Sequence, residues 1–177
     1  QSGDDDTLRA MRRPYDTRRY AETIERLREA VPGLGLTTDV MVGFPGEADE
    51  GFERSYAFVE MMHFSRLHVF RYSIRPNTLA AKMEDQTPPE AKERRSARLI
   101  KLGEHLSEDF AEKMIGQEQA VLAEKWNKKG TLWSGLTDNY VEVEFTGPES
   151  IRGEISNIRI TGRRGNVDEP CVIGVLL

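Results

Sequence analysis

Apolar residues in the first two thirds of the chain alternate between two kinds of spacing. In three segments they recur at steps of three and four, which predicts amphipathic helices; these segments are 15–31, 49–64 and 90–114. Apolar runs over 34–42 and 66–72 predict buried strands. Because strands and helices alternate, we expect parallel strands joined by crossover helices. The stretch 74–89 has three prolines and no period, which predicts a long loop.

The pattern changes after Gly116. Short segments follow, several of which alternate apolar and polar residues; they are 119–124, 132–136, 140–145 and 154–160. This pattern is typical of a small antiparallel β-barrel or sandwich. We therefore predict an α/β domain over 1–114 and a β domain over 115–177.

Composition and charge limit which partners and which cellular compartment we expect. With 30 acidic and 25 basic residues the net charge is −5, so a polyanion would have to bind a local basic patch. A single cysteine excludes an internal disulfide framework and a metal site of several thiolates. No apolar run reaches the roughly 18 residues that span a membrane, and the acidic start QSGDDD is unlike a signal peptide. We expect a cytoplasmic protein, and the missing initiator Met suggests a piece of a longer one.

Polar or glycine-rich turns follow the predicted strands, in the stretches QSGDDD, TTDVMVGFPGE and YSIRPNT. In α/β folds ligands bind where strands end and the next loops begin. Asp39 lies inside a strand, where Asp is disfavoured, which favours a binding role. The GFPGE turn is no phosphate loop, since no Lys-Ser or Lys-Thr follows it, and it remains open that its glycines only turn the chain.

Three stretches carry a family resemblance: QSGDDDTLRAMRRPYD, TTDVMVGFPGEADEGFE and LHVFRYSIRPNTLAAKM. They resemble the C-terminal half of the radical-SAM methylthiotransferases, and the segment LWSGLTDNYVEVEF resembles their TRAM domain. The resemblance implies the C-terminal half of a partial (β/α) barrel, followed by a small antiparallel, OB-like β-barrel that binds RNA. HVFRYS is closest to the branch acting on N6-threonylcarbamoyladenosine, although Arg71, Asn77 and Leu79 replace its usual Pro, Gly and Pro. Asn77 tolerates a left-handed turn.

The resemblance implies an S-adenosylmethionine site at the strand ends. The cofactor-binding residues it implies are Gln1, Ser2, Arg13, Asp39, Gly43, Phe44 and Tyr72. The Gln1 amide and the Asp39 carboxylate suit ribose hydroxyls, and the Arg13 guanidinium suits the methionine carboxylate. Gly43 would let the adenine approach the backbone.

Other interpretations stay open for several polar residues near this site. Arg13 is alternatively a solvated cation beside a helix. Glu47 is interpreted as capping or facing the N-terminus of the next helix, where an anion is favourable. His68 is interpreted as a hydrogen-bonded core residue and receives no role.

The family's iron–sulfur chemistry has no ligands here. Relatives bind a [4Fe–4S] cluster through CxxxCxxC and a second cluster through three further cysteines, but this chain has only Cys171, which we expect to be a buried small hydrophobe. We therefore expect no metal ligand and no catalytic residue in the chain. It should be a fragment that begins inside the barrel and is inactive alone.

The resemblance also implies a reaction and its partners. The parent enzyme would use S-adenosylmethionine and its clusters to form a 5′-deoxyadenosyl radical and add a methylthio group to C2 of N6-threonylcarbamoyladenosine 37. Its partners would be the anticodon stem-loop of transfer RNA and an electron donor such as flavodoxin or ferredoxin, with no membrane and no DNA. Two alternatives remain: a methylthiotransferase acting on a ribosomal-protein aspartate, and a non-catalytic RNA-binding module.

RNA binding by the second domain would need cations and aromatic rings on one face. The candidates are Lys125, Trp126, Lys128, Lys129, Trp133, Arg159, Arg163 and Arg164. From Ile115 onward there are seven basic and nine acidic residues, so any binding face must segregate its charge. Alternatively, the two tryptophans only pack the barrel.

Overall fold

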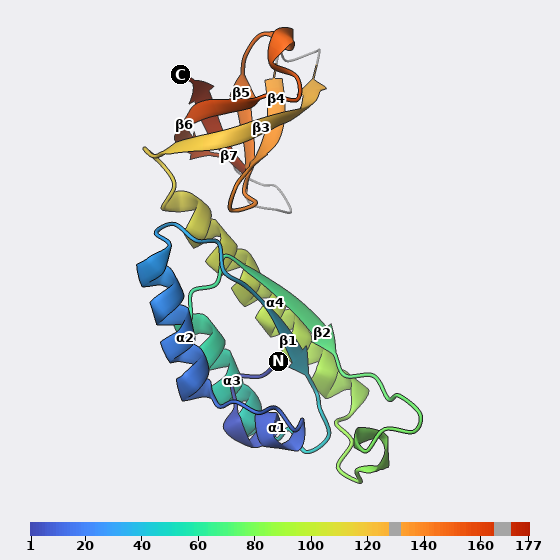
Figure 1. The fold of residues 1–177 in the computed structure, drawn as a ribbon. Helices are drawn as coiled ribbons and strands as arrows, with labels where there is room; N and C mark the ends of the chain where they lie inside the picture. Colours follow the sequence, from blue (N-terminus) through green and yellow to red (C-terminus); the bar gives the residue numbers. More distant parts are fainter. Residues whose placement is uncertain (128–131, 165–170) are drawn as a thin grey trace. The chain divides into compact units, whose positions relative to one another are not determined.

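A computed structural model describes residues 1–127, 132–164 and 171–177. The chain forms two compact units, Gln1–Leu106 and Ser107–Leu177 (Figure 1). The division falls inside the longest helix, earlier than the position near Ile115 at which the sequence pattern changes. No helix within the described ranges is long and apolar enough to cross a membrane.

The first unit is a two-stranded parallel sheet with helices packed along it (Figure 1). The strands are β1 (Thr37–Val42) and β2 (Arg66–Arg71), and the helices are α1 (Asp5–Ala10), α2 (Thr17–Ala30), α3 (Asp49–Met61) and α4 (Pro89–Glu112). The strands and the three longer helices lie close to their predicted places, and the alternation of strands and helices has its expected consequence, a parallel pair.

The two faces of this sheet differ in burial. Val40 and Val42 of β1 pack in one core cluster with Phe52 of α3 and Leu99 of α4, and each is at most 2% exposed. Asp39, directly before Val40, is exposed, because successive side chains of a strand point to opposite faces. One face of the sheet is therefore covered by helices, and the other carries the candidate binding residue Asp39.

Helix α1 was missed, because the sequence predicts only a polar turn there. Asp4 caps its N-terminus, since the Asp4 carboxylate accepts the Thr7 N–H at 2.9 Å and the Thr7 hydroxyl at 2.7 Å. Asp5 and Asp6 in the first turn are favourable beside the helix dipole. The loop expected over 74–89 is confirmed apart from the short 3₁₀ helix η1 (Ala80–Lys82).

The second unit is a closed barrel with the strand order β3-β4-β5-β7-β6. Its strands are β3 (Glu118–Asn127), β4 (Leu132–Thr137), β5 (Glu142–Thr146), β6 (Ile155–Arg163) and β7 (Cys171–Leu176), with a 3₁₀ turn, η2 (Glu149–Ile151), before β6. The expected purely antiparallel pairing is wrong at one place, because β5 and β7 are parallel. Five strands cannot alternate in direction around a closed ring, so one pair must be parallel.

The barrel interior is filled by the alternating apolar side chains of these strands. Trp133, Val143 and Ile158 are fully buried there. Cys171 is 3% exposed, which confirms the expectation of a small buried residue. Burial raises the pKa of its thiol to about 11, with a further contribution from Glu144, so the thiolate is scarce at neutral pH.

Candidate functional site

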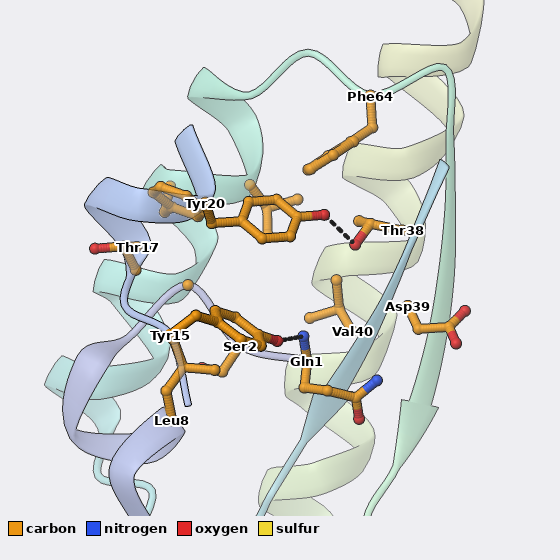
Figure 2. A pocket seen from close by; sticks show the side chains of 13 residues that line it. Gln1, Ser2, Leu8, Tyr15, Thr17, Tyr20, Thr38, Asp39, Val40 and Phe64 are labelled. Carbon is orange, nitrogen blue, oxygen red and sulfur yellow. Dashed lines mark hydrogen bonds between the residues drawn. The ribbon is translucent and has the colours of Figure 1, made fainter. Parts of the chain in front are cut away.

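A pocket opens along the edge of β1 in the first unit (Figure 2). The Gln1 carbonyl accepts the Met41 N–H at 2.9 Å, so the start of the chain runs beside β1. This contact places the Gln1 side chain next to Asp39, and both residues line the pocket. On the side of α2, the Tyr20 hydroxyl lies 3.2 Å from the Thr38 hydroxyl.

The enclosed part of this pocket is small and largely apolar. Its volume is about 20 Å³, which is room for about one water molecule. Its apolar walls are Leu8, Tyr15, Tyr20, Val40, Phe58, Val59 and Phe64. The Gln1 amide and the Asp39 carboxylate point away from the aromatic side chains (Figure 2). A nucleoside would therefore have to lie along Gln1 and Asp39, outside the enclosed space.

Arg13 belongs to the same neighbourhood. It is exposed in the connection between α1 and α2. Its guanidinium and the Asp39 carboxylate both lie near enough to the backbone nitrogen of Gln1 to interact with it electrostatically. Both charged groups therefore lie near Gln1, so the structure brings three of the predicted residues together.

Ser2 is placed differently. It lines the pocket, but its hydroxyl lies 3.4 Å from the Ser55 hydroxyl of α3 and accepts the Asp4 N–H at 3.2 Å. Ser2 is also buried. These bonds tie the first residues to α3 and α1.

Gly43, Phe44 and Tyr72 gather at the ends of the two strands. The Phe44 and Tyr72 rings meet edge to face, with centroids 5.4 Å apart. Gly43 has φ +72°, and a Cβ there would lie 2.3 Å from Cγ of Lys92 in α4. The space beside Gly43 that was expected to admit an adenine is therefore filled by the Lys92 stem, and the backbone conformation and this packing both require the glycine.

The interpretation of Glu47 as a helix cap is wrong. The N-cap of α3 is Ala48, without a side-chain bond. The Glu47 carboxylate instead accepts the Gly43 N–H at 2.6 Å and Nη1 of Arg95 at 2.8 Å. Nη2 of Arg95 donates to the Asp49 carboxylate at 2.8 Å. Burial raises the pKa of Glu47, and the Gly43 N–H and the Arg95 charge oppose that rise.

Helix α4 thus fixes the turn after β1 through Arg95 and Lys92, two residues that the sequence analysis did not single out. Glu47 and Arg95 expose only 1% and 5% of their side chains. Lys92, one turn before Arg95, donates from Nζ to the Tyr72 carbonyl at 3.2 Å. The only signal in the sequence was a pair of cations three residues apart on a helix.

The interpretation of His68 as a core residue is also wrong, because its side chain is exposed. His68 is the register partner of Asp39 across the parallel pair. Its ring centroid lies 5.9 Å from that of Phe70, two residues further along β2. His68 therefore faces the same side as Asp39.

The cationic candidates of the second unit are largely neutralised by carboxylates. Arg159 pairs with Glu118 at 2.6 Å and Arg163 with Glu108 at 3.4 Å. Arg164 forms an ion pair with the Glu144 carboxylate. Lys125 is exposed, whereas Lys128 and Lys129 lie outside the described residues.

The two tryptophans differ in burial, which bears on the alternative that they only pack the barrel. The Trp133 side chain is fully buried, and its indole N–H donates to the Pro148 carbonyl at 3.0 Å. Trp126 is partly buried against the barrel core, with its ring centroid 4.9 Å from that of Trp133. Trp133 therefore packs the barrel and offers no free ring face to a base.

Comparison with known proteins identifies the family. The profile of the Radical SAM superfamily matches residues 1–59. Threonylcarbamoyladenosine tRNA methylthiotransferase MtaB of Bacillus subtilis (strain 168) is 40% identical over 163 residues, which are 90% of this chain and 36% of that protein. The chain belongs to the radical SAM methylthiotransferase family.

Two further members show the same extent of similarity. The MtaB protein of Thermotoga maritima is 40% identical over 90% of this chain and 36% of its own length. A tRNA-2-methylthio-N(6)-dimethylallyladenosine synthase of Endomicrobium trichonymphae is 41% identical over 90% of this chain and 38% of its own length. The chain therefore spans little more than a third of these methylthiotransferases.

The residues present fit one of the two cofactors that a radical SAM methylthiotransferase implies. Asp39 offers an exposed carboxylate, Gln1 an amide and Arg13 a cation, which suit the ribose diol and the carboxylate of S-adenosylmethionine. The chain does not fit an iron–sulfur cluster, because its single cysteine, Cys171, is buried in the second unit.

Proposed function

We propose that the full-length protein containing this chain is a transfer-RNA methylthiotransferase that modifies C2 of N6-threonylcarbamoyladenosine. The observation that carries this proposal is the 40% identity over 90% of the chain to two relatives that are named for this nucleoside. The neighbourhood of Gln1, Arg13 and Asp39 supports it, because these residues suit the cofactor of the family.

In this proposal the first unit holds S-adenosylmethionine. The Asp39 carboxylate accepts hydrogen bonds from the ribose hydroxyls, and the Gln1 amide bonds the same sugar. The Arg13 guanidinium binds the methionine carboxylate. Phe44 and Tyr72, which are buried against each other at the strand ends, would border the adenine. Bound at a reduced cluster whose ligands this chain does not supply, the cofactor provides the radical chemistry.

The partners in this proposal are the anticodon stem-loop of transfer RNA and a reductant such as flavodoxin or ferredoxin. Two nucleosides have to be distinguished, since other relatives are named for N6-dimethylallyladenosine. The two substrates differ chemically: the threonylcarbamoyl group ends in a carboxylate, and the dimethylallyl group is apolar. An assay that presents both nucleosides therefore tests the branch.

The test uses the full-length protein, purified anaerobically with reconstituted clusters. It is incubated with S-adenosylmethionine, dithionite and transfer RNA from a strain lacking the enzyme, and the nucleosides are analysed by mass spectrometry. We expect a methylthio increment on N6-threonylcarbamoyladenosine. An increment only on N6-dimethylallyladenosine would refute the proposed branch. Cleavage of S-adenosylmethionine with neither nucleoside changed would favour the ribosomal-protein alternative.

A further inference from the structure

The connection between α1 and α2 and the first turn of α2 are rich in arginine. Arg12, Arg18 and Arg19 lie within eight residues of chain and are all exposed. We propose that these three residues, the rim arginines, bind the phosphate backbone of the RNA substrate beside the cofactor pocket. The inference rests on the proposed function, because it takes RNA as the substrate.

The rim arginines flank two residues of the pocket in the sequence. Tyr15 and Thr17, which stand between Arg12 and Arg18, both line the pocket with Gln1 and Asp39 (Figure 2). A nucleotide whose base reaches a cofactor bound along Gln1 and Asp39 has its own and its neighbours' phosphates close to the border of the pocket. Cations at the pocket border are therefore well placed to bind them.

The rim arginines also carry charge that no carboxylate neutralises. Within the described ranges, no carboxylate oxygen lies at ion-pair distance from their guanidinium groups. Four acidic residues nearby make contacts with other groups. Asp4 binds Arg54 at 2.8 Å, Asp5 accepts the Thr17 N–H at 2.8 Å, Asp6 pairs with Arg9, and Asp16 accepts the Arg19 N–H at 2.8 Å.

The backbone holds this connection in a defined conformation. Arg12 has φ +56°, in the left-handed region that residues with a Cβ rarely adopt. The Arg12 N–H donates to the Arg9 carbonyl and the Arg13 N–H to the Leu8 carbonyl, each at 2.9 Å. A preorganised loop loses less conformational freedom when it binds a ligand.

Three arginines of the second unit, in contrast, are paired with carboxylates. Arg159, Arg163 and Arg164 each pair with a carboxylate, so each would have to leave its partner before binding a phosphate. The rim arginines are thus unpaired within the described residues, whereas these three arginines of the second unit are paired. This contrast indicates that the rim arginines contribute more to phosphate binding than these three TRAM arginines do.

The test compares two triple variants of the full-length protein. One is Arg12→Gln/Arg18→Gln/Arg19→Gln, and the matched control is Arg159→Gln/Arg163→Gln/Arg164→Gln. Binding to a fluorescently labelled anticodon stem-loop RNA is measured by anisotropy over a series of salt concentrations. Arg13 is left unchanged, because it is assigned to the cofactor.

We expect the rim triple to lower the slope of log affinity against log salt by about 0.7 to 0.9 per phosphate contact removed. At about 0.1 M salt this is a loss of roughly five- to eightfold per contact. The control triple should change the slope by less than one contact. The three Arg→Lys replacements at the rim should retain the slope, since they keep the charge, and circular dichroism should match the parent for every variant.

Two results would overturn the inference. One is a rim triple variant that binds RNA as the parent does. If that variant is instead reduced more slowly by flavodoxin, the rim arginines bind an acidic protein and not RNA. The other is an equal loss in both triples. The binding assay needs no turnover, so it is independent of the nucleoside assay that decides the proposed function.

Discussion

Replacing Arg95 by Met should destabilise the first unit strongly. The change leaves the Glu47 carboxylate buried without the cation that lies 2.8 Å away. Removing one partner of a buried ion pair typically costs about 3–5 kcal/mol. The variant Arg98→Met is the matched control on the same helix: Arg98 pairs with the exposed Glu53, and exposed pairs contribute little.

The loss should depend on pH in a defined direction. Burial already raises the pKa of Glu47, and loss of Arg95 removes a cause that lowers it. The folded variant therefore binds a proton more readily than the unfolded chain, whose Glu pKa is near 4.5. Stability that the variant lacks at neutral pH should return as the pH falls through the raised pKa, so its deficit relative to the parent is smaller at pH 5 than at pH 7.5.

The two units can be followed separately in urea titrations. The α-helices of the described residues lie wholly or mainly in the first unit, so far-UV circular dichroism reports chiefly on it. Both tryptophans lie in the second unit and report on the barrel by fluorescence. The double variant Glu47→Gln/Arg95→Met keeps an acceptor for the Gly43 N–H and should recover much of the loss. A deficit in Arg95→Met no larger than in Arg98→Met, or one that grows on acidification, would refute the reasoning.

Three further predictions concern local features. Gly46→Ala, at φ +83° with open space, should lower the free energy of unfolding in urea titrations by about 1–2 kcal/mol. Gly43→Ala should lower it by more, because the new Cβ lies 2.3 Å from the Lys92 stem, and adding Lys92→Ala should remove that excess. Asp4→Ala should lose about 1–2 kcal/mol of cap stability at pH 7. Burial raises the pKa of Asp4 but its hydrogen bonds lower it more, so the parent's advantage over Asp4→Ala should disappear as the pH falls below 3.8. Cys171 should resist iodoacetamide at pH 8 until denaturant is added, because a pKa of about 11 leaves only ~0.1% thiolate.

The fold was predictable from sequence where a pattern of apolar and polar side chains runs along a whole helix or strand. The stripe on α4 and the apolar runs of β1 and β2 follow from burial on one side of each element. Helix α1 has six residues and depends on the Asp4 cap rather than on an apolar stripe, so periodicity could not find it. The parallel β5–β7 pair follows from closing five strands into a ring, which no single segment encodes.

The candidate site likewise has residues that the sequence reveals and contacts that only the structure reveals. Asp39 was identifiable, because a carboxylate inside an apolar strand violates a local preference. The Glu47–Arg95 pair joins residues 48 positions apart, and neither residue is unusual in its own segment. Likewise, composition cannot tell that Arg159 is paired with Glu118 while Arg12 is not, since both are exposed arginines in sequences with nearby acids.

The most direct test of the account is the affinity of the full-length protein for S-adenosylmethionine after the change Asp39→Ala. Thr37→Ala is the matched control, since Thr37 is exposed on the same strand two residues earlier. Hydrogen bonds to a charged group contribute about 1.5–3 kcal/mol, so calorimetric titration should show Asp39→Ala weakening the affinity about tenfold to a hundredfold, with Thr37→Ala unchanged. An Asp39→Ala variant that binds S-adenosylmethionine as tightly as the parent would contradict the assignment of this pocket to the cofactor.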